Sequence, residues 1–277
     1  MSIAQYPTPV RLGTFLVILL CLWLPLAIPI YLTVGDRNLV TILTMMLLFA
    51  EFLFFLNFWG KNVYGRTRIF SHYGLELSRQ NTTELFNGLS VGLCATLMLF
   101  GLEGLLGWLV WQKPQISLLQ LILEGLISAL LIGLAEELVF RGWLLDEFEQ
   151  NYHPNTALWL STLIFATLHF LKPLSEIVSN LPSFLGLLVL GIALVWAKRK
   201  HQGRLGKSIG LHSGLVWGYY IINVGNLVDY CPQIPQWITG VNNNPIAGVM
   251  GLFVLLAIAY FQKPPIKRPQ TDKWRRR

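Results

Sequence analysis

The sequence predicts an all-α polytopic membrane protein with about eight transmembrane helices. Of its 277 residues, 54% are hydrophobic and 13% are charged, whereas an ordinary soluble domain carries about 25% charged residues. This composition excludes a disordered chain, a disulfide-rich secreted scaffold, a coiled coil and a soluble enzyme with one ordinary core. Two further observations support the prediction: eight apolar segments along the chain, and a one-sided distribution of the basic residues between them.

The apolar segments are long enough, or nearly so, to cross a bilayer, which takes about 20 residues per helix. The predicted spans are residues 12–34, 39–59, 85–110, 116–145, 155–171, 181–197, 208–226 and 245–262. The first span is too long for the apolar part of a signal peptide, and no small-residue cleavage site follows it. The fifth and seventh spans are short and carry polar residues, so they are the weakest members of the set.

The basic residues test this topology independently. If the N-terminus is cytoplasmic and the spans alternate, seventeen of the 21 Lys and Arg residues lie on the cytoplasmic side. Three residues, Arg37, Lys113 and Lys172, lie on the other side. This asymmetry is what the positive-inside rule requires, so both termini are predicted to be cytoplasmic. The net charge of +7 then indicates contact with anionic lipid head groups, and no nucleic-acid partner is expected.

Four regions follow from these segments. They are three N-terminal spans in 1–115, a core in 116–226, a loop with the last span in 227–262, and a basic tail in 263–277 that we expect to be unstructured. Cys21, Cys94 and Cys231 are far apart, which predicts neither a disulfide framework nor a zinc-binding cluster.

Ionisable residues inside the predicted spans are the main functional signal, because a charge in a bilayer is costly. Glu51, Glu103 and Glu124 are each isolated among apolar residues or glycines. We interpret them as protonated or locally paired carboxyl groups that face the bundle. The alternative is a role in a proton or ion path.

The segment Ala135–Gly142 differs from these isolated carboxyl groups. Glu137 and Arg141 are four residues apart, so they lie on one helix face within reach of a salt bridge. Glu136 lies about 100° around the helix and needs another partner. A carboxylate that burial leaves unpaired holds a proton more readily, as a general base for water activation must. The alternative is a buried ion-pair cluster that holds helices together.

Two histidines lie in spans that follow this segment. His169 ends the pattern Phe165-x-x-x-His169, and His212 lies early in the seventh span, with Asn223 further along. The other histidines, His72, His153 and His201, fall in polar loops and are interpreted as solvated.

Two mechanisms fit these residues. In the first, His169, His212 and a glutamate bind a divalent metal such as zinc, which lowers the pKa of a bound water. In the second there is no metal: Glu136 takes a proton from water, and the histidines donate to the developing oxyanion. The sequence does not choose between them.

These motifs resemble those of the CAAX protease and bacteriocin-processing family of intramembrane proteases, which includes the type II CAAX prenyl endopeptidases and the abortive-infection-like proteins. The family motifs EExxxR, FxxxH and a third motif that begins with His occur here as Glu136-Glu137-x-x-x-Arg141, Phe165-x-x-x-His169 and His212-x-x-x-Val216. Their order and their placement in consecutive apolar segments agree with the family. The resemblance covers roughly residues 116–226.

The resemblance implies an intramembrane endopeptidase in which Glu136 activates water. It also implies that His169 and His212 are metal ligands or oxyanion donors, and that Glu137 and Arg141 hold the site. In the prenyl-processing members an Asn commonly ends the third motif and helps to bind the oxyanion. Val216 stands there in this chain and has no side-chain donor, which weakens the specific prediction of CAAX cleavage.

The expected substrate is a membrane protein or a lipidated peptide, and the expected location is a prokaryotic plasma membrane or a related internal membrane. The predicted loop 146–153 is acidic, with Asp146, Glu147 and Glu149, so we expect substrate to enter from the cytoplasmic side. Two other classes stay open. One is a non-catalytic scaffold for immunity or targeting on the same fold. The other is a transporter, for which the two related halves with paired broken helices are missing.

Overall fold

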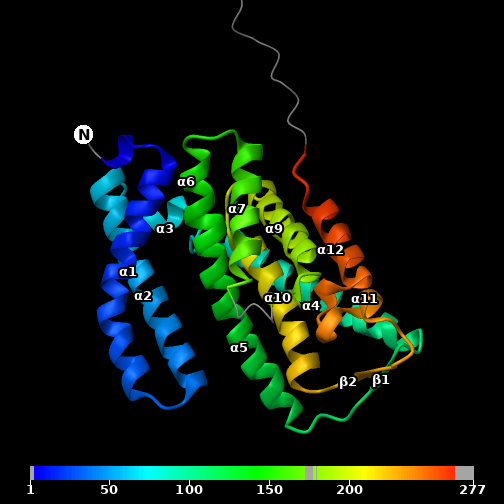
Figure 1. Ribbon diagram of the computed structural model, residues 1–277. Coiled ribbons are helices and arrows are strands. Elements are labelled where there is room, and N and C mark those ends of the chain that lie inside the picture. The colour runs from blue at the N-terminus through cyan, green and yellow to red at the C-terminus, as the bar shows by residue number, and fades with distance from the viewer. Residues whose placement is uncertain (1–2, 172–176, 179, 266–277) are drawn as a thin grey trace, which may run out of the picture.

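The computed structural model describes residues 3–171, 177–178 and 180–265. Lys172 and most of the predicted basic tail lie outside the described residues. Within them the chain is a bundle of helices with one small sheet of two strands (Figure 1). The predicted all-α membrane class is therefore confirmed at the level of the fold.

Each predicted apolar segment corresponds to a helix. The helices are α1 (Thr8–Thr33), α2 (Arg37–Tyr64), α4 (Arg79–Leu105), α5 (Leu118–Glu137), α7 (Pro154–Leu168), α9 (Ser183–Lys200), α10 (Gly206–Val224) and α12 (Val249–Gln262). Short helical elements join them: η1 (Ile3–Gln5), α3 (Ile69–His72), η2 (Leu138–Leu144), α6 (Leu145–Glu149), α11 (Gln236–Thr239), η3 (Val241–Asn243) and η4 (Pro245–Ala247).

Four helical segments in the described part of the chain are long and apolar enough to cross a membrane. They are α1, α2, α4 and the continuous helix Leu118–Glu149, and α12 is a shorter apolar helix. The protein is therefore an integral membrane protein. The beginning of α1 and the end of α12 lie at the same end of the bundle (Figure 1), as an even number of crossings requires. The number of eight spans and the cytoplasmic position of the termini stay predictions.

The fourth helix is longer than the sequence predicts. It does not end at residue 145, because α5 continues through η2, a π-helix, into α6, which ends at Glu149. The prediction of an acidic loop at 146–153 is therefore wrong over its first part. Its acidic residues are also neutralised: Glu147 pairs with Arg11, Asp146 with Arg66, and Glu149 with Arg199.

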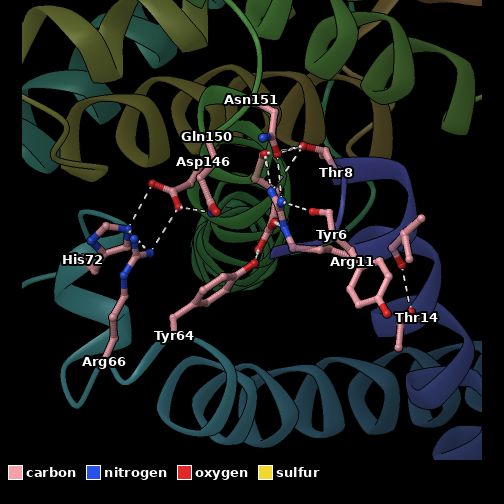
Figure 2. A network of polar contacts seen from close by, with 12 residues as sticks. Tyr6, Thr8, Arg11, Thr14, Tyr64, Arg66, His72, Asp146, Gln150 and Asn151 are labelled. Atoms are coloured by element: carbon pink, nitrogen blue, oxygen red, sulfur yellow. Dashed lines mark hydrogen bonds and ion pairs between the residues drawn. The ribbon is translucent and has the colours of Figure 1, made fainter. Parts of the chain in front are cut away.

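Figure 2 shows the network around the first two of these pairs. Arg11 Nε lies 2.9 Å from Glu147 Oε2, and the two side chains are 2% and 1% exposed. Tyr64 of α2 donates to the other oxygen of Glu147 at 2.6 Å, and Thr8 donates to the Glu147 carbonyl at 3.1 Å. The helix pair α1–α2 is thus tied to α6 by a buried polar cluster. Removal of one partner from a buried ion pair of this kind strongly destabilises the folded protein.

Several basic residues that the topology assigns to the lipid head groups point inward instead. Arg11, Lys198 and Lys207 are all buried. Lys198 Nζ donates to the Arg141 carbonyl at 2.6 Å, and Lys207 Nζ donates to Asn87 Oδ1. The expectation that these three residues face head groups is wrong, because backbone carbonyls and polar side chains of the bundle bind them.

Close packing of α10 against α4 fixes the position of the seventh predicted span. Gly206, Gly210, Gly214 and Gly218 recur every four residues along α10. A Cβ atom at Gly210 would lie 2.0 Å from the Leu85 carbonyl oxygen of α4. Small residues at this spacing allow two membrane helices to approach closely, so this pattern was a readable signal for the α4–α10 contact.

A two-stranded ribbon closes the opposite end of the bundle from the chain termini (Figure 1). β1 (Leu109–Trp111) pairs antiparallel with β2 (Val228–Tyr230), with Leu109 opposite Tyr230. The predicted span 85–110 is therefore too long, because α4 ends at Leu105 and Gly107, with φ of 72°, turns the chain into β1. Cys21, Cys94 and Cys231 are all free.

Candidate active site

The fold brings together the five residues that the sequence singled out. Glu136 and Glu137 are the last two residues of α5, and Arg141 lies in the π-helix η2. His169 is the C-cap residue of α7, and His212 lies in α10. α10 packs against α5, and α7 packs against η2, so the helices that carry these residues meet at the site.

Glu137 is the buried centre of the cluster. Its Oε1 accepts from Arg141 Nη1 at 2.8 Å and from His212 Nδ1 at 2.9 Å, and its side chain is fully buried. The predicted i,i+4 pair is confirmed. One carboxylate oxygen therefore neutralises the arginine and also orients the imidazole of the third motif.

Phe165 connects the arginine to both histidines. The Arg141 guanidinium carbon lies 4.1 Å from the centroid of the Phe165 ring, within the range of a cation–π interaction. The same ring lies edge-on to His169 and His212, with centroids 4.6 and 6.3 Å apart. Phe165 is fully buried. Its contacts with Arg141, His169 and His212 explain why an aromatic residue stands at this position.

Hydrogen bonds assign the proton of each imidazole. His169 Nδ1 lies 2.8 Å from the Phe165 carbonyl oxygen, which can only accept, so Nδ1 carries a proton. His212 Nδ1 faces the Glu137 carboxylate in the same way. In the neutral ring Nε2 then has a lone pair and no proton.

Both of these Nε2 atoms face Glu136. Glu136 Oε2 lies 3.7 Å from His169 Nε2 and 3.9 Å from His212 Nε2. The oxygen is buried and has no hydrogen-bond partner among the described residues, although 29% of the Glu136 side chain is exposed. The two imidazoles are therefore the partners that the sequence predicted Glu136 to need. Their distances leave room for a small group, such as a water, between the Glu136 oxygen and the two Nε2 atoms.

A cavity of about 220 Å³ begins beside the two histidines. Aliphatic side chains from α9, α10 and α12 form most of its wall, and its exposed lining is largely apolar. Val216 and Tyr219 of α10 line it as well. An apolar chamber next to a base and two imidazoles suits a substrate segment with apolar side chains or a lipid chain.

Two residues that support the site were missed. The π-helix exposes carbonyl groups at Phe140 and Arg141, and Ser161 Oγ donates to the first at 3.1 Å while Lys198 Nζ donates to the second at 2.6 Å. π-helical turns are common at functional sites. Ser161 lies eight residues before His169 in the sequence, but no pattern marks it. In the sequence Lys198 is one member of the basic run 198–200, so nothing distinguishes it from its neighbours.

The three atoms that face one another are of types that bind metals. Two imidazole Nε2 atoms and one carboxylate oxygen are ligands that zinc uses, and Nδ1 atoms bound to other acceptors are typical of metal-binding histidines. However, no group of three His, Cys, Asp or Glu side chains in the described ranges is arranged to hold a metal ion. The distances of 3.7 and 3.9 Å exceed the roughly 3.3 Å between ligands of a tetrahedral zinc site with bonds of about 2.0 Å. In this arrangement the three atoms are too far apart to bind the ion together.

The isolated carboxyl groups lie outside the cluster. Glu103 is fully buried and its Oε2 accepts from Tyr230 of β2 at 2.9 Å, which is the locally paired state expected for it. Burial and the neighbouring Glu103 raise the pKa of Tyr230. Glu124 accepts from Gln120 at 2.8 Å, and Glu51 has one buried oxygen with no described partner.

The remaining histidines also lie outside the cluster, but each has a local contact. His72 contacts Asp146, His153 caps the start of α7, and His201 contacts the Ala197 carbonyl. The interpretation of these residues as simply solvated is incomplete for this reason.

Comparison with protein families agrees with this geometry. Residues 118–218 match the family model of type II CAAX prenyl endopeptidases, Rce1-like. Over these residues the chain is similar to the CAAX proteases. No curated protein and no solved structure matches the chain.

The matched segment begins at the first residue of α5 and ends in α10. It therefore contains Glu136, Glu137, Arg141, His169 and His212, and it lies within the predicted core of 116–226. The match supports a CAAX-type protease. The roles of individual residues and the substrate are not part of that match.

Proposed function

We propose that this protein is an intramembrane endopeptidase that hydrolyses a peptide bond of a membrane-associated or prenylated protein, with Glu136 as the base that activates water. One observation carries this proposal. Glu136 Oε2 is buried, has no described hydrogen-bond partner and faces two imidazole Nε2 atoms. The adjacent Glu137 is already bound by Arg141 and His212. Glu136 is thus the carboxylate of the pair that can accept a proton from water.

The proposed reaction uses the geometry as follows. A water between Glu136 and the histidines gives its proton to Glu136, and the hydroxide attacks the carbonyl carbon of the scissile bond. The oxyanion of the tetrahedral intermediate then needs hydrogen-bond donors. Collapse of the intermediate breaks the C–N bond, and Glu136 returns the proton to the leaving nitrogen. Glu137 holds His212 in one orientation throughout through the bond to Nδ1.

The histidines can contribute in one of two ways. An imidazole whose Nδ1–H is already bound can donate from Nε2 only when both ring nitrogens carry protons. Alternatively, a small rearrangement that shortens the 3.7 and 3.9 Å separations would let Glu136, His169 and His212 hold a divalent metal such as zinc, whose chemistry is to acidify a bound water. Metal analysis of the purified protein decides between these alternatives.

The proposed partners follow from the surroundings of the site. The apolar cavity beside His169 and His212 favours a lipidated peptide or an apolar segment of a membrane protein. The bilayer itself is the second partner, and anionic head groups on the cytoplasmic side would meet those basic residues that remain exposed. We place the protein in a prokaryotic plasma membrane or a related internal membrane.

A cleavage assay on the full chain tests the proposal. The protein is purified in detergent and incubated with a fluorogenic farnesylated CAAX peptide, with metal analysis of the same preparation. We expect Glu136→Gln to lower the rate by about 10²- to 10⁴-fold, the usual contribution of a general base. The control is Glu124→Gln on the same helix, whose carboxylate bonds to Gln120 and which should stay within about twofold of the wild-type rate.

Two outcomes contradict the proposal. One is a Glu136→Gln variant with the full wild-type rate. The other is a folded wild-type protein that cleaves neither this peptide nor unmodified membrane-protein segments, which would favour the scaffold reading.

A further inference from the structure

Tyr219 lines the cavity beside the two histidines, and the mechanism above does not use its hydroxyl group. It lies on α10, is partly buried and lines the same cavity as His169 and His212. Among the hydrogen bonds of the described residues, none involves the Tyr219 hydroxyl, and it is not one of the fully buried polar atoms without a partner. A phenol in this position is free to bind a group that enters the cavity.

Helix geometry places Tyr219 on the same face of α10 as His212. His212, Val216 and Tyr219 are spaced i, i+4 and i+7, so they share one face of α10, and all three line the cavity. Tyr219 thus lies about two helical turns beyond His212 along the wall of the same cavity.

The site needs a donor that its other residues do not readily supply. The neutral imidazoles present lone pairs at Nε2, because their Nδ1 atoms are bound to Phe165 and Glu137. Val216 is aliphatic. Thr96 also lines the cavity, but the one proton of its hydroxyl faces backbone carbonyl oxygens, at 3.1 Å from Gly92 and 3.4 Å from Leu215.

Asn244 is the other amide side chain in the cavity wall. Its Oδ1 accepts from the backbone N–H of Ile246 at 3.3 Å, where it caps η4. This bond ties the amide to the start of η4. Tyr219 is thus the lining side chain whose donor is both free and on the helix of His212.

We propose that the Tyr219 hydroxyl donates a hydrogen bond to the carbonyl oxygen of the scissile bond and to the oxyanion that forms from it. This inference rests on the proposed function. Because the negative charge on that oxygen grows toward the tetrahedral intermediate, the bond strengthens in the transition state. Tyr219 would then be a catalytic residue, although no motif marks it.

The test compares Tyr219→Phe with Tyr220→Phe. Tyr220 is the next residue on α10, but its ring faces Gly125 of α5, where an added Cβ would lie 2.6 Å from it. Both variants keep the ring and lose one hydroxyl. With the fluorogenic farnesylated peptide, we expect Tyr219→Phe to lower kcat by about 10²- to 10³-fold, as loss of one oxyanion donor does. KM should change by less than about threefold, and Tyr220→Phe should match the wild type.

A second measurement does not need turnover. A fluorescent farnesylated peptide that ends in an aldehyde presents a carbonyl oxygen, and the same peptide with a methylene group in that place does not. We expect Tyr219→Phe to weaken binding of the aldehyde by about tenfold, the usual effect of one lost hydrogen bond, and to leave binding of the methylene peptide unchanged. Tyr219→Phe retains the aromatic ring. A melting temperature of this variant equal to that of the wild type excludes a folding defect as the cause.

The outcomes separate the two proposals. If Glu136→Gln abolishes cleavage but Tyr219→Phe changes neither kcat nor aldehyde binding, the role of Tyr219 is overturned and the proposed function stands. If Glu136→Gln still cleaves, the proposed function fails, and the aldehyde measurement still decides the role of Tyr219. A folded protein that binds neither peptide overturns both.

Discussion

Glu136 and Glu137 are neighbours in the sequence with opposite surroundings. Glu137 is fully buried, and one of its oxygens binds both Arg141 and His212. Glu136 keeps 29% of its side chain exposed and has two imidazoles near one oxygen at 3.7 and 3.9 Å. A helix rotates by about 100° per residue, so consecutive positions can serve as structural anchor and as base. Two adjacent glutamates can therefore have different roles: Glu137 orients His212, and Glu136 faces the two imidazoles.

Arg141 should contribute much more stability than a surface arginine. It is buried, pairs with Glu137 and stacks over Phe165. Replacing it with Gln leaves the Glu137 carboxylate buried with one fewer partner. We expect Arg141→Gln to lower the free energy of unfolding by about 3–5 kcal/mol. The measurement is thermal or denaturant unfolding of the full chain in detergent.

Arg199 is the matched control for this prediction. Its pair with Glu149 is exposed at 21% and 36%, and surface pairs contribute about 0–1 kcal/mol. Equal losses for Arg141→Gln and Arg199→Gln would contradict the assignment of Arg141 as a buried anchor.

At the scale of elements, the π-helix η2 is the segment that most needs outside support. It follows directly after the two glutamates. The Phe140 carbonyl accepts from Leu145 N–H and Ser161 Oγ, and the Arg141 carbonyl accepts from Lys198 Nζ. Side chains of α7 and α9 therefore bind the backbone of η2 beside the site. The helices that carry His169 and the basic run thus help to position the helix that carries Glu136.

Lys198 should act as a positioning residue. Lys198→Met removes the donor to the Arg141 carbonyl and leaves that buried oxygen without it, so we expect a loss of about 1–3 kcal/mol in the free energy of unfolding. Because the perturbed turn follows Glu137, kcat should also fall. Lys198→Arg, which keeps a donor, should restore part of kcat.

The exposed Lys200 provides the control. It donates to the Phe261 carbonyl of α12, away from η2, so Lys200→Met should preserve both quantities. If Lys198→Met has a wild-type kcat, the bond to Arg141 does not position the site.

At the scale of the whole molecule, buried contacts join the N-terminal helices to the core. Arg11 of α1 and Tyr64 of α2 both bind Glu147 of α6 (Figure 2), and glycines of α10 allow α4 to approach. These helices lie outside residues 118–218 of the family match. They nevertheless pack as part of the same bundle. α1 and α2 contact α6, and α4 contacts α10, so the N-terminal helices support the segment that carries the site at both of its ends.

The topology makes a prediction for the intact protein in its membrane. In a chain with Cys21, Cys94 and Cys231 replaced by Ser, Lys61→Cys should react with a membrane-impermeant thiol reagent added from the cytoplasmic side only. Lys113→Cys, in the exposed segment between β1 and α5, should react from the other side only. The reason is the charge asymmetry of the positive-inside rule. Reaction of both cysteines from the same side would contradict the alternation of spans between them.

The sequence predicted local features well wherever the signal lies within one element. The eight apolar segments became helices, and the spacing of Glu137 and Arg141 gave the salt bridge, because both depend on helical periodicity alone. The extension of the fourth helix to Glu149 was not predicted. Its acidic end looks like a loop, and partners that stabilise it, such as Arg11, come from distant parts of the chain.

By itself the sequence determined the membrane class, the candidate residues of the site and the resemblance of the core to CAAX proteases, because apolar runs and spaced motifs are local patterns. The tertiary structure alone decided which glutamate is anchored and which faces the histidines. It also decided that Lys198 turns inward to a carbonyl and that Tyr219 shares a cavity with His212. These outcomes depend on which helices pack together. Side-chain partners from other helices set the charge and hydrogen bonding of each group, and no single segment of sequence contains that information.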